Sequence, residues 1–427
     1  MTDSFHFISE PALTFGEGQE AEDPRDGLAL FGPFEKRDSL SDHIVIGTKS
    51  GIELWQGWCN ALNAPAACVD INRQRPWPPY PGFEVAFGAP WPNPARSYTI
   101  DNQELDNSAR KSNRFERAYS VANLYMGHIR KIQKLDSRPT LAILVVPDSI
   151  YDYCRPKSSV SDRSDSPRTA EEKKFLTGVL KDHEAGQSRF DIFDEDGIFD
   201  SPENLEQYGL SPDFRRQIKA RVMKYEIPVQ IVRESTLTIT EQIRNGEKGV
   251  NPLSDRLWNL GTGLFYKSGQ KPWKTPWARD GVCYVGIAYK KVEHEKVTAC
   301  CAAQLFLDSG DGIVFVGDFG PWYSKETEEF HLTSPAAEKM LRGTISAYKE
   351  QDGRPLKEVF LHSRSGINRD EYDAFQRALP AGVKLTAIRV RKDKLGPRLM
   401  RWDSHPKGSR RGMHPVLRGT FWQQSQR

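Results

Sequence analysis

Five polar side chains in the middle of the chain have the types and spacing of an anion-binding site. They are Arg215, Lys219, Gln230, Asn259 and Lys267. The first two are four residues apart in a predicted helix over residues 211–225, so both cations would lie on one helix face. Cations and amides that converge on one place can hold a terminal phosphate. The spacing alone favours the plainer alternative of five ordinary surface residues.

The elements that would position these residues alternate between strand and helix. Two apolar runs predict buried strands and two amphipathic stretches predict helices, in the order strand 43–48, helix 51–62, helix 113–135 and strand 140–147. The helix over 211–225, with Ser211 as its expected N-cap and Pro212 at its first position, then leads to the strand 227–232. This alternation predicts an α/β domain with a Rossmann-like sheet.

The C-terminal half begins with strands that follow one another directly and then alternate with helices. The predicted elements are strands 281–289, 297–307 and 313–317, helix 335–348, strand 356–363, helix 368–379 and strand 384–392. Asn368 and Glu371 have the spacing of a capping box at the second helix. This order is typical of an RNase H-like fold.

Two other motifs are weaker. In FDIFDEDGIFDSPE, four residues match positions of an EF-hand loop, namely Asp194, Asp196, Gly197 and Glu203. The first ligand position would be Ile192, which has no ligand oxygen, so a solvated acidic loop is the better interpretation. The six cysteines include no C-x-x-C pair, and we expect buried free thiols in a reducing cytoplasm without a zinc site.

Size and charge set further limits. A chain of 427 residues predicts two or three domains, and no stretch of about 20 apolar residues suggests a membrane span. The net charge of +3 hides an asymmetry, since residues 381–427 have 12 Lys and Arg against 2 Asp and Glu. A folded surface that faces a polyanion and a solvated tail both fit this basic end.

An ordered set of segments gives the chain a family resemblance. FGPFEK, TLAILVVPDSIYDY, QIKARVMKYEIPVQIVREST, GLFYKSGQKPW, TACCAAQLFLDSGDGIVF, EVFLHSRSGI and PVLRGT, in this order, resemble short prokaryotic Argonautes. That family combines a MID domain with a PIWI domain and lacks the N-terminal and PAZ domains of long Argonautes. The resemblance implies an N-terminal segment over residues 1–42 that packs on PIWI, MID over 43–271 and PIWI over 272–427.

The resemblance also implies roles for the five polar residues. The MID domain of the family binds the 5′-phosphate of a guide strand, and the matching positions are Arg215, Lys219, Gln230, Asn259 and Lys267. Two departures stand out. Gly263 occupies a position where related proteins can carry another glutamine, and Arg216 is an alternative to Arg215 as the first cation.

The PIWI positions that hold catalytic metal ions in the family are changed. PIWI domains that cut use carboxylates to bind two Mg²⁺ ions. Ala288 stands at the first carboxylate position and Ser365 at the position after the arginine in HSRSGI. Neither side chain can neutralise a divalent ion, so we expect no catalytic metal and no cleavage. The resemblance still leaves Mg²⁺ as an expected ion at the guide 5′-phosphate.

A guide-binding protein without cleavage activity needs a separate output. The resemblance implies a cytoplasmic defence complex in which a guide RNA pairs with single-stranded target DNA. Pairing would activate a partner that has an APAZ region and a TIR, sirtuin-like or nuclease effector. The chain stops at RGTFWQQSQR, earlier than family PIWI domains usually end, so a truncated C-terminus and a differently made phosphate contact are both open.

Two alternatives compete with this interpretation. An active nuclease would need carboxylates from other positions, for example Asp308, Asp311 or Glu371. An interaction scaffold with a vestigial guide site would be expected to lack the phosphate-binding cations, yet Lys219 and Lys267 are present.

Overall fold

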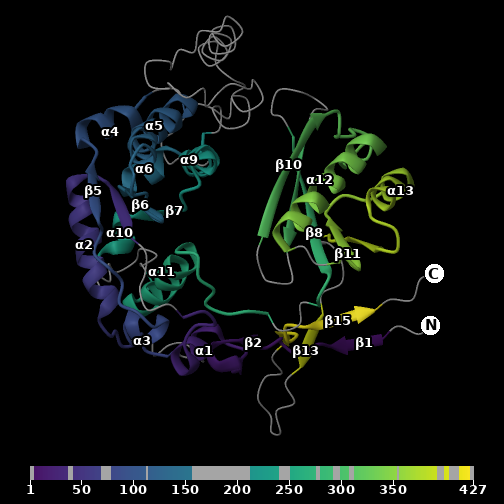
Figure 1. The fold of residues 1–427 in the computed structure, drawn as a ribbon, viewed down its shortest axis with the longest axis horizontal. Coiled ribbons are helices and arrows are strands. Elements are labelled where there is room, and N and C mark those ends of the chain that lie inside the picture. Colours follow the sequence, from purple (N-terminus) through teal and green to yellow (C-terminus); the bar gives the residue numbers. More distant parts are fainter. Residues whose placement is uncertain are drawn as a thin grey trace, which may run out of the picture. The chain divides into compact units, whose positions relative to one another are not determined.

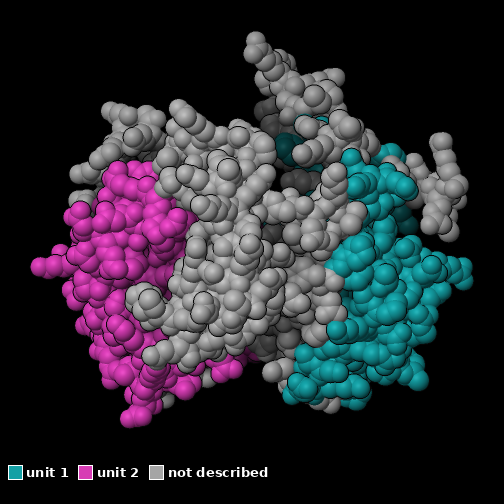
Figure 2. All heavy atoms as spheres, turned by 90° about the horizontal axis from the view of Figure 1, so that it is seen from above, with its two compact units in different colours: residues 1–13, 274–427 teal, residues 14–273 magenta. Residues whose placement is uncertain are grey.

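The computed structural model divides into two compact units. Unit 1 consists of Met1–Leu13 and Lys274–Arg427, and unit 2 of Thr14–Trp273 (Figure 2). The residues that the structure describes are 4–36, 42–68, 78–111, 114–155, 212–239, 251–275, 279–291, 299–306, 312–352, 355–391, 399–402 and 413–423. In these ranges no helix has the length and apolar character needed to cross a bilayer.

Unit 2 is built on a parallel sheet of four strands, ordered β5-β4-β6-β7. The strands are β5 (Arg96–Thr99), β4 (His43–Gly47), β6 (Leu141–Val146) and β7 (Val229–Arg233). Every residue of β4 and β6 is buried, because these two strands lie in the middle of the sheet with helices on both faces. The predicted Rossmann-like sheet is therefore present, and β5 is the strand that the sequence pattern did not reveal.

Helices cover the two faces of this sheet (Figure 1). On one face Ile44 and Leu144 pack against α5 and α9, and on the other Val145 approaches Gly51 at the start of α2. The helices of unit 2 are α1 (Pro24–Phe31), α2 (Lys49–Asn63), α3 (Phe83–Phe87), α4 (Asn102–Ala109), α5 (Arg114–Gln133), α6 (Asp148–Tyr153), α9 (Phe214–Val222), α10 (Glu234–Leu237) and α11 (Leu253–Lys267). The described residues of unit 2 also form two short 3₁₀ turns, Gly16–Gly18 and Met223–Tyr225.

The proline-rich stretch before β5 is ordered where the structure describes it. Tyr80, Phe83, Phe87 and Trp91 are almost fully buried, and the Tyr80 hydroxyl donates to the Leu62 carbonyl at 3.0 Å. The acidic loop with EF-hand spacing, residues 192–203, lies outside the described residues.

The N-terminal segment is divided between the two units. Residues 4–13 lie in unit 1, but residues 14–36 belong to unit 2, with α1 beside the helix α11. Arg25 of α1 contacts Asp255 of α11, and the Phe34 amide donates to the Pro272 carbonyl at 3.0 Å. These contacts join Arg25 and Phe34 to later parts of unit 2.

Unit 1 contains a mixed sheet in the order β10-β9-β8-β11-β12. The strands are β8 (Val282–Lys291), β9 (Ala299–Phe306), β10 (Gly312–Gly320), β11 (Glu358–Ser363) and β12 (Lys384–Arg389). β8, β9 and β10 pair antiparallel, whereas β11 pairs parallel with both β8 and β12. This is the RNase H-like order that the sequence predicted.

Two helices, α12 (Ser334–Asp352) and α13 (Arg369–Ala378), cover this sheet. The core between them contains Leu341, Ile345 and Phe375 from the helices. The capping box is present at α13, where Asn368 accepts from the Glu371 amide at 2.9 Å and Glu371 accepts from the Asn368 amide at 3.1 Å.

Small two-stranded sheets join segments that lie outside the main sheets. The first pairs the two ends of the chain, β1 (Ser4–Phe7) with β15 (Thr420–Gln423). The others are β2 (Leu13–Thr14) with β3 (Glu20–Ala21), and β13 (Met400–Trp402) with β14 (Met413–Pro415).

The cysteines that the structure describes are free thiols. Cys59, Cys154 and Cys283 are buried, and burial raises the pKa of each to about 12. Cys68 is partly exposed. No cluster of three or more His, Cys, Asp or Glu side chains suited to a metal ion occurs within the described ranges.

Candidate functional site

Helix α9 presents two cations on its solvent face. Arg215 and Lys219 are exposed, one turn apart, whereas Phe214, Ile218 and Val222 are buried in the core of unit 2. The helix begins at Phe214 because Asp213 is its N-cap and accepts from the Arg215 amide at 3.0 Å. The prediction of Ser211 as the N-cap is wrong, because the helix begins later in the chain. The aspartate caps it two residues later.

Lys267 joins these two cations from helix α11. It is the last residue of that helix, it is half-buried, and its Nζ donates to the Val229 carbonyl of β7 at 2.5 Å. Burial, together with the charges of Lys219 and Arg215, lowers the pKa of Lys267 to about 8. Three cations from two helices are therefore close enough to repel one another.

Arg215, rather than its neighbour, belongs to this cluster. The charge of Arg215 acts on Lys267, whereas Arg216 forms an ion pair with Asp213, with Nε and Oδ2 3.5 Å apart. Within the described residues, Arg215, Lys219 and Lys267 form no ion pair with a carboxylate. We call these three residues the cation cluster.

Gln230 lies next to the cation cluster on strand β7. It follows Val229, whose carbonyl accepts from Lys267, and its side chain is half-buried. Its Nε2 donates to the Ile231 carbonyl at 3.1 Å. An anion at the cluster could therefore take a hydrogen bond from Gln230 only if the amide group exchanged partners or used its second N–H.

Asn259 lies on the same helix as Lys267 but farther from the cation cluster. It precedes Lys267 by eight residues on α11, which corresponds to about 12 Å of helix. Its Oδ1 accepts from Nη2 of Arg25 at 3.1 Å, and the same Nη2 contacts Asp255. Arg25 is a neighbour that the sequence did not predict, since it lies more than 200 residues earlier in the chain.

The helix face between Asn259 and Lys267 is open at its centre. Gly263 is one turn from each of them, and a Cβ built on it would meet nothing within 4 Å. Gly263 thus leaves space on the helix face beside the cation cluster.

The second predicted site lies at one edge of the unit 1 sheet. Ala288 is exposed near the end of β8, and Ser365 follows the end of β11. Because Ile287 and Ser363 are partners in the parallel pair β8 and β11, the two positions lie at the same edge. The Ser365 Oγ accepts from the Phe330 amide at 3.2 Å.

Of the carboxylates proposed for an active nuclease, Glu371 is in the described residues and is engaged in structural contacts. It is almost fully buried, and Oε1 accepts from the Leu332 amide at 2.6 Å. Its Oε2 lies 3.0 Å from Nδ1 of His331 and also completes the capping box. Asp308 and Asp311 lie outside the described residues.

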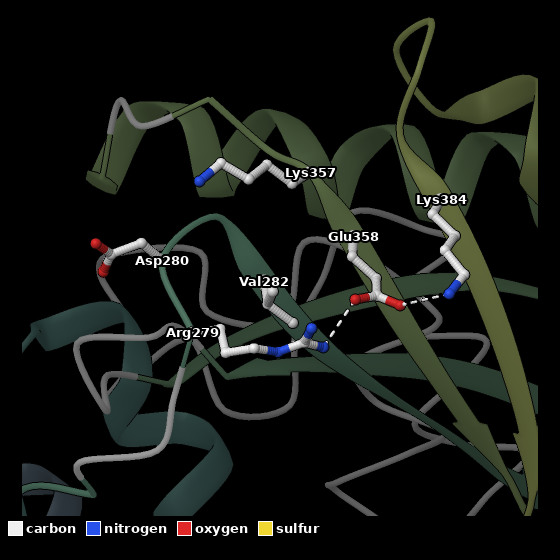
Figure 3. A pocket seen from close by; sticks show the side chains of 6 residues that line it. All are labelled: Arg279, Asp280, Val282, Lys357, Glu358 and Lys384. Atoms are coloured by element: carbon white, nitrogen blue, oxygen red, sulfur yellow. Dashed lines mark hydrogen bonds and ion pairs between the residues drawn. The ribbon is translucent and has the colours of Figure 1, made fainter.

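A pocket lies at the opposite edge of the same sheet, where the parallel strands begin (Figure 3). Glu358 is its central group, with Oε2 accepting from Nη2 of Arg279 at 2.7 Å and Oε1 3.4 Å from Nζ of Lys384. Asp280, Val282 and Lys357 complete the lining. Three basic side chains thus line the pocket against two carboxylates, and Glu358 contacts two of the three.

Comparisons with known proteins support the fold. No protein-family model and no curated protein matches the chain. Among solved structures, Clostridium butyricum Argonaute bound to a guide DNA (5′ deoxycytidine) and a 19-mer target DNA matches with a TM-score of 0.57 and 14% identity, over 99% of this chain and 44% of that chain. A. aeolicus Argonaute has a TM-score of 0.44 and 15% identity, over 90% and 39%. Drosophila Piwi has a TM-score of 0.45 and 11% identity, over 84% and 34%.

The match to Clostridium butyricum Argonaute shows an Argonaute-like α/β fold. The chain spans less than half the length of each of these three structures. Within this fold, unit 2 contains the Rossmann-like sheet and unit 1 the RNase H-like sheet.

Proposed function

We propose that the chain is the guide-binding subunit of a short Argonaute system and that the cation cluster holds the 5′-phosphate of a guide strand. The observation that carries the proposal is that Arg215 and Lys219, one turn apart on α9, act with their charges on Lys267, which ends α11 and contacts β7. Bringing three cations together without a carboxylate costs free energy in the free chain. A bound phosphate removes that cost.

A terminal phosphate fits this site better than a carboxylate does. A phosphate monoester carries close to two negative charges at neutral pH and three acceptor oxygens. Three cations can each reach one oxygen, with Gln230 as a fourth donor. Asn259 would contribute only after it leaves Arg25, so the proposal gives it a lesser role than the other four residues.

Mg²⁺ at the 5′-phosphate remains part of the proposal as a supplementary ion. The described residues of the cation cluster neutralise a phosphate without it and offer no carboxylate to hold it. The chain end, where the family places a helping carboxylate, lies outside the described residues.

The proposal assigns no cleavage activity to unit 1. The residues at the metal positions do not fit a pair of divalent ions, because Ala288 has no ligand atom and the Ser365 hydroxyl is already an acceptor for the Phe330 amide. The guide, which we propose to be RNA, would pair with single-stranded target DNA without cutting it.

The output of the complex is assigned to a partner protein. The chain covers 44% of the length of Clostridium butyricum Argonaute, and the ordered segments resemble family members that work with an APAZ protein. We propose such a partner, with a TIR, sirtuin-like or nuclease effector that target pairing activates, in a cytoplasmic defence system. The competing nuclease is disfavoured by the contacts of Glu371, and the scaffold by the presence of the cation cluster.

The experiment is to purify the chain with any partner from its native host and to label and sequence the nucleic acid that comes with it. The proposal expects short RNA strands with 5′-phosphates from the wild type and their depletion from Lys219→Ala/Lys267→Ala. Wild-type protein without such strands, or equal recovery from the double variant, would refute it. Cleavage of a matched target by the chain alone would refute the assignment of a silent PIWI domain.

A further inference from the structure

A carboxylate in unit 1 occupies a position built for an anion. Glu329, in the loop between β10 and α12, contacts Nη2 of Arg389 through Oε1 and accepts from the Gly366 amide through Oε2 at 2.9 Å. The Gly366 N–H, followed by the Arg389 charge, keeps the pKa of Glu329 below its usual value. One guanidinium and one backbone N–H thus hold a carboxylate that stays ionised.

This position is at the sheet edge where the fold family binds catalytic metal ions. Gly366 directly follows Ser365, and Arg389 is the partner of Ser363 in the parallel pair β11 and β12. A Cβ built on Gly366 would lie 3.6 Å from Nη1 of Arg389. The guanidinium therefore places a fixed positive charge beside the vacated metal position, where a divalent cation would be repelled.

Arg389 has donors to spare. A guanidinium has five N–H groups, and Glu329 takes one of them among the described residues. The side chain of Arg389 is 36% exposed, and that of Glu329 is 25% exposed, so solvent reaches the pair. Arg364 and Arg391 are exposed at the same edge and form no ion pair within the described part of the chain.

We propose that Arg389 and the Gly366 amide form a binding site for a phosphodiester of a nucleic-acid strand, and that Glu329 fills this site until the strand displaces it. This site rests on the proposed function, because the strand that it would bind is the target paired with the guide. A carboxylate and a phosphodiester present the same pair of acceptor oxygens to a guanidinium, so one can replace the other without a change of donors.

The loop that carries Glu329 strengthens the competition. Glu326 and Glu328 are exposed on the same loop, so while Glu329 stays on Arg389 the loop repels a nearby phosphate. The Ser365 hydroxyl holds the loop at the Phe330 amide, one residue from Glu329. In this arrangement, positive charge that a metal supplies in other PIWI domains comes from the protein itself.

The test measures binding of a preformed RNA–DNA duplex with 5′-hydroxyl ends to the full chain, over a range of salt concentrations. Such ends carry no terminal phosphate, so the result does not depend on the cation cluster. Arg389→Ala should weaken binding about ten-fold and reduce the salt slope by about 0.9, the value for one lost phosphate contact. Glu329→Gln should strengthen binding, because the competing charge is gone.

Arg342 and Glu338 supply matched controls, since they form an exposed ion pair between the same residue types on helix α12. Arg342→Ala and Glu338→Gln should leave duplex affinity and salt slope unchanged, and thermal unfolding checks that all four variants fold. Equal affinity of Arg389→Ala and wild type would overturn the site. Weaker binding by Glu329→Gln would overturn the claim that the strand displaces Glu329, and Glu329 would then be a positioning residue for Arg389. If the duplex results are as expected but the chain does not bind a guide, the proposed function is refuted and the Arg389 site is not.

Discussion

Lys219 lowers the pKa of Lys267 across the space between two helices. Burial is the larger cause, and together with the charges of Lys219 and Arg215 it brings the pKa of Lys267 to about 8 from an ordinary 10.5. A lysine in this state is partly deprotonated slightly above physiological pH. It becomes fully charged when an anion arrives, which links phosphate binding to proton uptake.

The first prediction concerns the pH dependence of that binding. Affinity for a 5′-phosphorylated strand should fall as the pH rises through about 8, because the free chain then loses the charge of Lys267. The phosphate contributes little to this change, since its second pKa is about 6. Binding titrations at constant ionic strength would measure it. In Lys219→Gln the fall should move to higher pH, because a repelling charge is gone.

Stability gives an independent check on the same pKa. Between about pH 8 and 10.5 the unfolded chain binds more protons at Lys267 than the folded chain does, so this residue makes stability rise with pH in that window. Lys267→Met should remove this part of the pH dependence of urea unfolding. An unchanged pH profile in Lys267→Met would contradict the lowered pKa.

The second prediction concerns the contact that joins the N-terminal helix to α11. The Asp255 side chain is 5% exposed and contacts Arg25, so Arg25→Ala should leave a buried charge without this partner. We expect a loss of about 3 kcal/mol in the free energy of unfolding. Arg25→Met/Asp255→Leu should recover most of it, because an apolar pair needs no charge compensation.

Arg110 is the control for this measurement. It forms an exposed i,i+4 pair with Asp106, so Arg110→Ala should cost no more than about 0.5 kcal/mol. If Arg25→Ala costs as little as Arg110→Ala in urea unfolding, the contact does not hold α1 in place.

The third prediction separates a structural role of Glu371 from a catalytic one. Glu371→Ala should lower the free energy of unfolding by about 2 kcal/mol or more, because the buried amide of Leu332 and the part-buried amide of Asn368 lose their acceptor. Glu338→Ala, which removes an exposed glutamate from α12, is the matched control. A stability gain in Glu371→Ala would instead indicate a strained functional carboxylate.

Much of the fold follows from local sequence patterns. The runs of β4 and β6 indicate central strands because their residues are almost all apolar. Asn368 and Glu371 mark the start of α13 because the two partners of the capping box are three residues apart. The four-residue spacing of Arg215 and Lys219 likewise places them on one face of a helix. Each of these signals lies within a few residues of the structure it predicts.

The features that the sequence did not predict depend on distant partners. The contact of Arg25 with Asp255 and the pairing of β1 with β15 each join residues more than 200 positions apart. The periodicity of apolar residues in the sequence does not predict such contacts. Glu329 with Arg389 is similar, since one is in an irregular loop and the other in a strand. At α9, the sequence pattern predicted Ser211 as the N-cap, whereas the Asp213 side chain accepts from the first amides of the helix.

The most direct test of the account compares RNA strands that differ only at the 5′ end. The wild-type chain should bind a 5′-phosphorylated strand at least about ten-fold more tightly than the 5′-hydroxyl strand. Lys219→Ala/Lys267→Ala should lose this preference and keep its affinity for the 5′-hydroxyl strand. The control variant Lys49→Ala/Lys131→Ala removes two exposed lysines elsewhere in unit 2 and should keep the preference. Equal affinity of the wild type for both strands, or an unchanged preference in Lys219→Ala/Lys267→Ala, would contradict the account.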